Sequence, residues 1–295
     1  MAKKTAEELL AERQIRYPYR SLEDYLIANP LHADAQLDDG WGATYPVKGC
    51  ELEATVLFAD ISGFSGRTLD LTPAETLAFV NNFFAWITTE ALRGRLGVVD
   101  KYIGDEIMVV FSEEFGAKDP FREAVEAARF IGENDVHAFS PHMGLASGRV
   151  IVGYVGTPLK YSASVFGAPV AMAARCAGVA PDEDDTIVSS TIVFPAEEWG
   201  DRDFGEVMAP VRYRVPKEMR TEGESEFFDK PHGWNLRDPR EVDLKNLPQT
   251  EIREIVNEAF HLPSNAAEDR ARESIEWMRK HGAYRPRWRD ESPER

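Results

Sequence analysis

Cysteine is scarce in this sequence, and Cys50 and Cys176 are the only two among 295 residues. Two cysteines give neither a zinc-binding cluster nor the disulfide framework of a small secreted domain. The N-terminus, Met-Ala-Lys-Lys-Thr-Ala-Glu-Glu, lacks the apolar core of a signal peptide. Apolar runs of about 18 residues are also missing, so no membrane-spanning helix is expected. These absences predict a reduced, cytoplasmic protein.

Positive charge is also in short supply. The chain has 34 Lys and Arg against 51 Asp and Glu, a net charge of −17. Partners such as nucleic acids or anionic membranes require a basic surface, so neither is expected. A nucleotide substrate remains compatible, because a metal ion and a few cations can reverse the field at one site. Hydrophobic residues make up 43% of the chain, which is enough for a packed core.

The pattern along the chain predicts three regions. Residues 1–50 are interpreted as an N-terminal extension with short helices, 51–215 as the main domain, and 216–295 as a partly helical C-terminal extension. In the last region, helices are expected over Glu251–Phe260 and Ala266–Lys280. Residues 196–250 are polar and irregular, and the pattern assigns no element to them.

The main domain mixes strands, hairpins and helices. The elements expected are a strand over Glu53–Asp60, a helix over Pro73–Leu92, a hairpin with strands at Gly97–Tyr102 and Glu106–Phe111, a helix over Pro120–Gly132, a hairpin over His142–Val155, a helix over Pro169–Ala177 and a strand over Thr186–Ser189. This mixture predicts an α+β fold with a mostly antiparallel sheet, closer to ferredoxin-like than to doubly wound folds.

Two aspartates stand at the ends of apolar, strand-like runs. Asp60 ends the first run, and Asp105 lies at the turn of the predicted hairpin. A carboxylate is costly to bury unless it is paired or binds a metal. Mg²⁺ is commonly held by one or two carboxylates together with substrate phosphates. A glycine turn follows at Ser62–Ser65, and free backbone N–H groups in such turns bind phosphate well. These residues predict chemistry on a nucleoside triphosphate.

Four motifs resemble those of class III nucleotidyl cyclase catalytic domains, in the same order and over about half of the chain. Phe58–Phe64 resembles the first metal motif of that family, and Lys101–Met108 resembles the second. His142–Gly153 is similar to the hairpin that helps to form the dimer interface. Gly167–Arg175 is similar to the helix that carries the transition-state arginine.

The resemblance implies a head-to-tail homodimer with two sites at its interface. In each site, one subunit would hold two Mg²⁺ or Mn²⁺ ions through Asp60, Asp105 and the carbonyl of Ile61. The N–H groups of Gly63 and Phe64 would bind the triphosphate. The first motif also places Phe58 among the substrate-binding candidates.

The other subunit would supply the cationic groups of that site. The resemblance assigns Lys101 to the base and Arg175 to the charge that develops on the phosphoryl group. Arginine suits that place because it stays charged and forks onto phosphate oxygens. Lys160 is a further candidate for the phosphates.

Three positions depart from the family pattern. Members that use ATP usually have Asp or Thr where this chain has Ser164, and most have Asn where this chain has Ala171. The position beside Lys101 holds the large ring of Tyr102. An altered purine pocket with short extensions resembles the bacterial pyrimidine cyclases of antiphage (Pycsar-type) systems. Those enzymes make cyclic UMP or cyclic CMP, which activates a separate effector.

These departures predict UTP as the substrate and cyclic UMP and pyrophosphate as the products. Tyr102 would narrow the pocket to one ring, although a packed strand aromatic is the alternative interpretation. Lys101 would donate to uracil O4, whereas cytosine offers an amino donor there. Ser164 can donate or accept and decides nothing alone. An adenylate cyclase is the first alternative function, and an inactive cyclase-fold module, suggested by Ala171, is the second.

Overall fold

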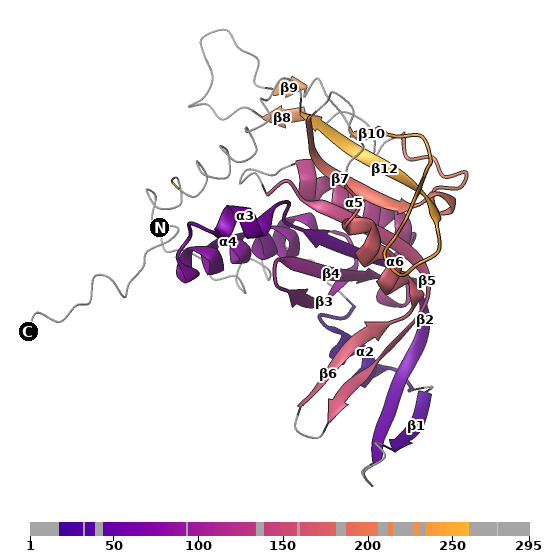
Figure 1. The fold of residues 1–295 in the computed structure, drawn as a ribbon. Coiled ribbons are helices and arrows are strands. Elements are labelled where there is room, and N and C mark those ends of the chain that lie inside the picture. Colours follow the sequence, from indigo (N-terminus) through magenta and orange to yellow (C-terminus); the bar gives the residue numbers. More distant parts are fainter. Residues whose placement is uncertain are drawn as a thin grey trace, which may run out of the picture.

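A computed structural model describes residues 18–31, 33–38, 44–92, 94–133, 139–157, 160–180, 187–205, 212–214, 227–229, 234–259 and 276 of the chain. Its centre is a sheet in the order β10-β12-β7-β5-β2-β4-β3, with β1 on β2, β6 on β5 and β11 on β12 (Figure 1). The strands are β1 Ala33–Asp38, β2 Thr44–Asp60, β3 Gly97–Ile103, β4 Glu106–Phe111, β5 His142–Thr157, β6 Lys160–Phe166, β7 Ile187–Pro195, β10 Trp234–Leu236, β11 Arg240–Val242 and β12 Thr250–Ala259.

Most of the strand pairs in this sheet are antiparallel. The parallel pair is β5 with β7, which joins His142–Gly144 to Thr191–Val193. A separate antiparallel pair consists of β8 Arg212–Arg214 and β9 Phe227–Asp229. This topology confirms the prediction of an α+β fold with a mostly antiparallel sheet.

The helices lie on both faces of the sheet. They are α2 Leu22–Ala28, α3 Phe64–Thr68, α4 Pro73–Trp86, α5 Pro120–Glu133 and α6 Ala168–Ala177, with a π-helical turn at Ile87–Ala91 and 3-10 turns at Glu113–Phe115 and Ala196–Glu198. Helix α4 starts at Thr72, whose side chain accepts from the Glu75 N–H while Glu75 bonds back to the Thr72 N–H. This capping box and Pro73 at the first helical position explain why the chain becomes helical there.

Alternation along the strands divides the interior into two cores. On β4, Ile107 and Val109 belong to a core shared with α4 and α5, here called the α4–α5 core. Met108 and Val110 belong to a core shared with α2 and α6, called the α2–α6 core. Successive strand residues point to opposite faces, so one strand supplies both cores.

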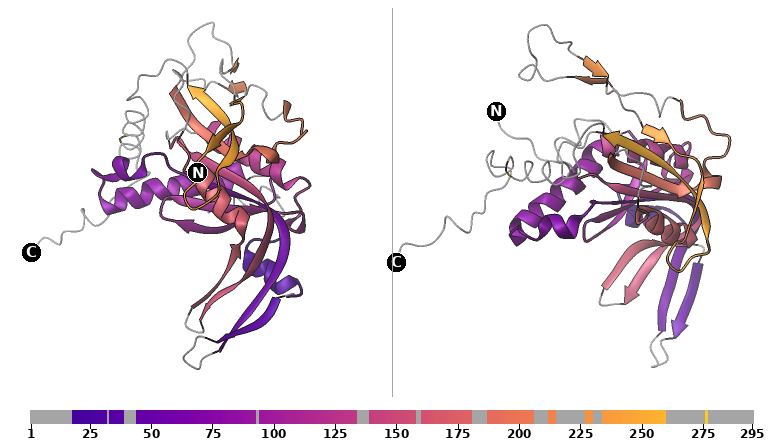
Figure 2. Two further views of the ribbon diagram at one scale, coloured as in Figure 1. Left: turned by 45° about the vertical axis from the view of Figure 1, so that its right-hand side comes forward. Right: turned by 45° about the horizontal axis from the view of Figure 1, so that its top comes forward.

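The strands β2 and β5, with 17 and 16 residues, are longer than the other strands of the sheet. Their far halves carry β1 and β6 and form an arm that extends away from α4 (Figures 1 and 2). The predicted hairpin over His142–Val155 is wrong, because β5 is a single strand that pairs with β2 in unbroken register from His142 to Tyr154. The hairpin is formed instead by β5 and β6.

The predicted helix over Glu251–Phe260 is also wrong, since this segment forms β12. Ile252 and Ile255 are three residues apart, which resembles helical spacing, but they lie on the two faces of a strand. Ile255 packs in the α4–α5 core, and Ile252 packs in a small third cluster with Cys176, Val193 and Leu244. Neighbouring strands pair with both edges of β12, and Ile255 and Ile252 are buried on its two opposite faces. A strand buried on both faces loses the alternation that would identify it. The predicted helix over Ala266–Lys280 lies outside the described residues, except for Glu276.

Both predicted extensions supply strands to the sheet. β2 crosses residue 50, and β12 brings residues 250–259 beside β7. Helix α2, capped by the side chain of Ser21, is one of the short helices expected in the N-terminal extension. In the described ranges, no helix has the length and apolarity that crossing a bilayer requires.

Candidate active site

The structure brings Asp60 and Asp105 together. Asp60 is the last residue of β2, and Asp105 lies in the turn between β3 and β4, after Gly104 with its positive φ of 66°. Because β2 pairs with β4 up to Ala59 and Ile107, the end of β2 lies beside this turn. The two carboxyl side chains share a hydrogen bond. Burial, the charge and hydrogen bond of Asp105, and the charge of Glu106 raise the pKa of Asp60 to about 7.

This pair has the chemistry of a hard-cation site. Two carboxylates at hydrogen-bonding distance repel when both are ionised, and a divalent cation removes that repulsion. In the described part of the chain, no group of three or more His, Cys, Asp and Glu side chains is placed to hold a metal. The side-chain oxygens at this place come from a pair of carboxylates, and Mg²⁺ commonly takes one or two carboxylates together with substrate phosphates.

The loop after Asp60 supplies backbone groups. The buried residue Ile61 accepts a hydrogen bond from the Phe64 N–H at 3.2 Å, and a carbonyl keeps a second lone pair for another partner. Gly63 precedes α3 with a φ of 63°, a conformation that other residues adopt at a cost. The Phe64 N–H would have to exchange its bond to Ile61 for one to phosphate. The Phe58 side chain is buried in the α2–α6 core, so the structure places it in the packing around the site.

Lys101 and Ser164 also meet, although they come from β3 and β6. The Lys101 ammonium donates to the Ser164 hydroxyl. The same ammonium lies 3.1 Å from the carboxylate of Asp100. Ser164 in turn donates to that carboxylate at 3.1 Å. We call these three residues the Lys101 cluster.

Asp100 is the member of this cluster that sequence analysis missed. It is the extra residue of a β-bulge, since Val99 pairs with Val109 and Lys101 pairs with the next residue, Met108. Burial raises the pKa of Asp100, while Lys101, Ser164 and the Val165 N–H act to lower it. An aspartate inside the apolar run Val98–Ile103 was the available signal, because an unpaired carboxylate would be costly there.

Tyr102 is not part of the Lys101 cluster. It pairs with Ile107 across the strands, and Ile107 lies in the α4–α5 core, whereas Lys101 pairs with Met108 of the α2–α6 core. The Tyr102 ring stacks on Phe84 of α4, with centroids 4.3 Å apart. The aromatic ring beside Lys101 is instead Phe166, whose centroid is 5.9 Å from the ammonium. Sequence analysis missed Phe166.

The two cationic candidates for the phosphates are exposed. Arg175 lies in the last turn of α6, and Lys160 lies at the start of β6. Ala171, which stands where the family usually has asparagine, is also exposed on α6. These side chains are therefore accessible to a second molecule.

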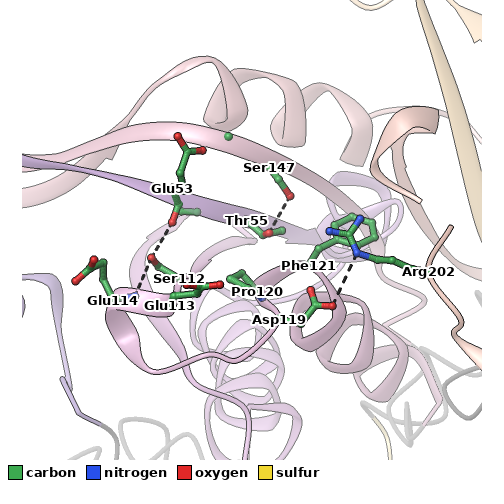
Figure 3. Close-up of a pocket in the computed structure, with 12 residues that line it drawn as sticks. Glu53, Thr55, Ser112, Glu113, Glu114, Asp119, Pro120, Phe121, Ser147 and Arg202 are labelled. Carbon is green, nitrogen blue, oxygen red and sulfur yellow. Dashed lines mark hydrogen bonds and ion pairs between the residues drawn. The ribbon is translucent and has the colours of Figure 1, made fainter. Parts of the chain in front are cut away.

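A separate cleft of about 380 Å³ lies between the middle of β2 and the start of α5 (Figure 3). Its charged side chains are Arg202 and four carboxylates, namely Glu53, Glu113, Glu114 and Asp119. Its hydroxyls are used internally: Ser112 donates to the Glu53 carbonyl at 2.7 Å, and Thr55 bonds to Ser147 at 2.8 Å. The predominance of carboxylates makes this cleft a poor site for a triphosphate, and it contains none of the predicted site residues.

Comparison with known families agrees with this geometry. Residues 50–194 match the family model described as the adenylate and guanylate cyclase catalytic domain. This segment is similar to nucleotidyl cyclase catalytic domains. The matched region contains Asp60, Asp105, the Lys101 cluster and Arg175.

Curated relatives share this cyclase segment with the chain. An uncharacterized protein of Mycobacterium bovis is 31% identical over 145 residues, which are 48% of this chain and 27% of that protein. An uncharacterized protein of Mycobacterium tuberculosis is 29% identical over 181 residues, which are 57% of this chain and 34% of that protein. The chain therefore spans about a third or less of the length of these relatives.

Solved structures with a similar fold include cyclases. The adenylyl cyclase CyaB from P. aeruginosa superposes with a TM-score of 0.50 and 17% identity, over 73% of this chain and 99% of that chain. A bacterial light-regulated adenylyl cyclase has a TM-score of 0.50 and 20% identity, over 77% of this chain and 58% of that chain. At these identities the likeness concerns the fold of the cyclase domain.

Proposed function

We propose that the protein converts a nucleoside triphosphate, with UTP as the favoured substrate, into a 3′,5′-cyclic nucleotide and pyrophosphate. The observation that carries this proposal is the Asp60–Asp105 pair inside the matched cyclase segment. Two carboxylates at the ends of neighbouring elements are what a cation-assisted attack on a phosphate needs from the protein.

Asp60, Asp105 and the Ile61 carbonyl are the proposed ligands of two Mg²⁺ or Mn²⁺ ions. When bound, these ions would lower the charge barrier to attack of the ribose 3′-oxygen on the α-phosphorus and to departure of pyrophosphate. Gly63 and Phe64 would bind the triphosphate through their N–H groups. Arg175 would place its guanidinium against the phosphoryl oxygens, and Lys160 would add a second positive charge.

A homodimer with sites at its interface completes this proposal. Large apolar side chains are exposed on three strands: Tyr102 and Ile103 on β3, Val155 on β5, and Tyr161 and Phe166 on β6. Exposed apolar groups of this kind are typical of surfaces that a partner covers. Arg175 and Lys160 are accessible for a neighbouring subunit's site.

The choice of UTP over CTP and ATP rests on Lys101. Its ammonium can only donate, so it suits the keto oxygen of uracil and not the amino group of cytosine or adenine. Tyr102 no longer supports a limit on ring size, because it stacks on Phe84. We further propose that cyclic UMP acts as a messenger to a separate effector in antiphage defence, as the resemblance to Pycsar-type cyclases implies.

An adenylate cyclase is the second candidate. The similar folds include two proteins described as adenylyl cyclases, which favours ATP. Ser164 disfavours an adenylate cyclase, because cyclases of this family that use ATP usually have Asp or Thr at that position.

A competition assay tests the proposed function. The purified protein is incubated with Mn²⁺ and equal amounts of ATP, GTP, CTP and UTP, and the cyclic products are separated by mass. Cyclic UMP is the expected main product, and cyclic AMP would establish the second candidate instead.

Two variants accompany the assay. Asp60→Asn should abolish product formation, whereas Asp243→Asn, which removes the same charge from an exposed loop, should leave it unchanged. Activity that survives in Asp60→Asn would overturn the metal assignment.

A further inference from the structure

Glu106 is a third carboxylate beside the aspartate pair, and sequence analysis assigned no role to it. It is the first residue of β4 and follows Asp105 directly in the chain. The strands β2 and β4 pair in register up to Ala59 and Ile107. The next step of that register places Asp60, the last residue of β2, opposite Glu106.

Glu106 and Asp60 also point to the same face of the sheet. Phe58 and Met108 are opposite each other, two residues before Asp60 and two residues after Glu106, and both pack in the α2–α6 core. Side chains two residues apart along a strand share a face, and directly opposite residues of antiparallel strands have Cβ atoms about 5 Å apart. Both carboxylates are partly exposed, so this end of the sheet presents them side by side to the solvent.

The charge of Glu106 reaches the aspartate pair. It adds to the effects that raise the pKa of Asp60. Among the described residues, no cationic side chain pairs with Glu106. Like charges directly opposite each other destabilise a sheet. The chain therefore keeps a third, uncompensated carboxylate at the place where the proposed cations bind.

Glu106 differs from the two aspartates in what it can do for a cation. Asp60, Asp105 and Glu106 do not form a group that is placed to hold one ion together. Mg²⁺ usually keeps several of its waters when a protein binds it. A carboxylate just outside the ligands can accept hydrogen bonds from such waters, and loss of an outer partner commonly costs about 10- to 100-fold in metal affinity.

We propose that Glu106 is a positioning residue of the metal site, which strengthens the binding of divalent cations through its negative charge and by accepting hydrogen bonds from waters that the cation retains. This inference rests on the proposed function, because it assumes that Asp60 and Asp105 bind the cations. It deepens that function, because the resemblance to the cyclases gives Glu106 no part in metal binding.

The test measures Mn²⁺ binding without nucleotide at pH 8. Electron paramagnetic resonance of free Mn²⁺ gives the dissociation constant, and Glu106→Gln should raise it about tenfold or more. Scanning calorimetry with EDTA gives the melting temperature of the metal-free protein. The same variant should raise that temperature by about 1–3 °C, because it removes repulsion between opposed carboxylates. A glutamate that served only the fold would lower the melting temperature when replaced.

Three further variants separate charge from structure. Glu106→Asp keeps the charge and should bind Mn²⁺ within about threefold of the wild type. Glu251→Gln is the matched control, because Glu251 on β12 is exposed and opposite Glu241 on β11. It removes the same charge from a second pair of opposed carboxylates and should leave the Mn²⁺ affinity unchanged. Asp60→Asn removes a proposed ligand and should abolish Mn²⁺ binding.

These variants also distinguish the role of Glu106 from the proposed function. Wild-type affinity in Glu106→Gln overturns the inference, and the metal assignment stands if Asp60→Asn has lost Mn²⁺. If Glu106→Gln does not melt cooperatively, Glu106→Thr, a neutral residue that suits strands, decides in its place. Wild-type affinity in Asp60→Asn, or a wild-type protein that binds no Mn²⁺, refutes both the metal assignment and the inference. The expected affinities in a protein that yields no cyclic product refute the proposed reaction while supporting the role of Glu106.

Discussion

Lys101 and Tyr102 are neighbours in the chain, yet they serve opposite faces of the sheet. Lys101 turns toward Ser164 and the α2–α6 core, and Tyr102 turns toward Phe84 of α4. Strand geometry requires this separation, because successive side chains alternate between the two faces. A base that contacts Lys101 therefore lies on the face away from Tyr102, and the two residues have separable effects.

Substitutions of Lys101 and Tyr102 should have separate effects on catalysis. Lys101→Ala should raise the KM for the favoured triphosphate by about tenfold, because it removes a charged donor at the base. Tyr102→Ala should change the ratio of UTP to CTP turnover by less than about twofold, since the ring faces α4. Steady-state kinetics with UTP and CTP check both results. A large loss of base selection in Tyr102→Ala would contradict the arrangement of β3.

The stability of the metal-free protein should depend on pH through Asp60. Its pKa rises from 3.8 to about 7 in the folded state, so the folded protein holds this proton more tightly than the unfolded chain. That stabilisation is complete below pH 3.8 and is lost as the pH rises through 7. With EDTA present, the melting temperature should therefore fall over this window.

Asp60→Asn should flatten that fall, because the amide does not titrate. Mn²⁺ should raise the melting temperature more at pH 8 than at pH 5, since it replaces the proton. Scanning calorimetry across the range measures each effect. If the melting temperatures of the wild-type and Asp60→Asn proteins fall equally with pH, the Asp60 carboxylate does not control the pH dependence of stability.

Mixed subunits should test the shared site. Asp60→Ala and Arg175→Ala proteins should each be inactive alone. An equal mixture, denatured together and refolded, should regain about a quarter of the wild-type activity, because half of the dimers are mixed and each holds one intact site. Mass photometry reports the dimer, and the cyclase assay reports the recovery. A mixture that stays inactive while forming dimers argues for sites contained within one subunit.

The ion pair between Arg240 and Glu254 should contribute to the anchoring of β12. Their side-chain atoms lie 2.6 Å apart, and the Glu254 side chain is only 1% exposed. Arg240→Met should lower the free energy of unfolding by about 3 kcal/mol, because it leaves a buried carboxylate without its partner. The double variant with Glu254→Gln should recover much of that loss, since the uncompensated charge is gone. Urea unfolding monitored by tryptophan fluorescence measures both.

Local patterns predicted the elements that carry the aspartates. The hairpin of β3 and β4 has turn residues between two apolar runs, and Pro73 with its capping residues marks the start of α4. Neither pattern depends on distant parts of the chain. The order and spacing of the motifs then identified Asp60 and Asp105 as a pair.

The features that sequence analysis missed depend on contacts between distant segments. β12 is buried on both faces, so its apolar residues imitate helical spacing. The bulge at Asp100 shifts the pairing of β3 by one residue, and no local signal marks that shift. The bond from Lys101 to Ser164 joins β3 to β6, which are far apart in sequence, so the Lys101 cluster emerged only from the fold.

The long ladder between β2 and β5 has a consequence for folding. Asp60 meets its register partner His142 only after the chain that contains α3, α4, the β3–β4 hairpin and α5 has closed into a loop. Closing a loop of this size costs conformational entropy before the stabilising contacts between the strands have formed, so such pairings form slowly. The hairpin that carries Asp105 is local and can form early. The aspartate pair itself needs only the shorter loop closure that docks β2 on β4, whereas the ladder between β2 and β5 is completed later.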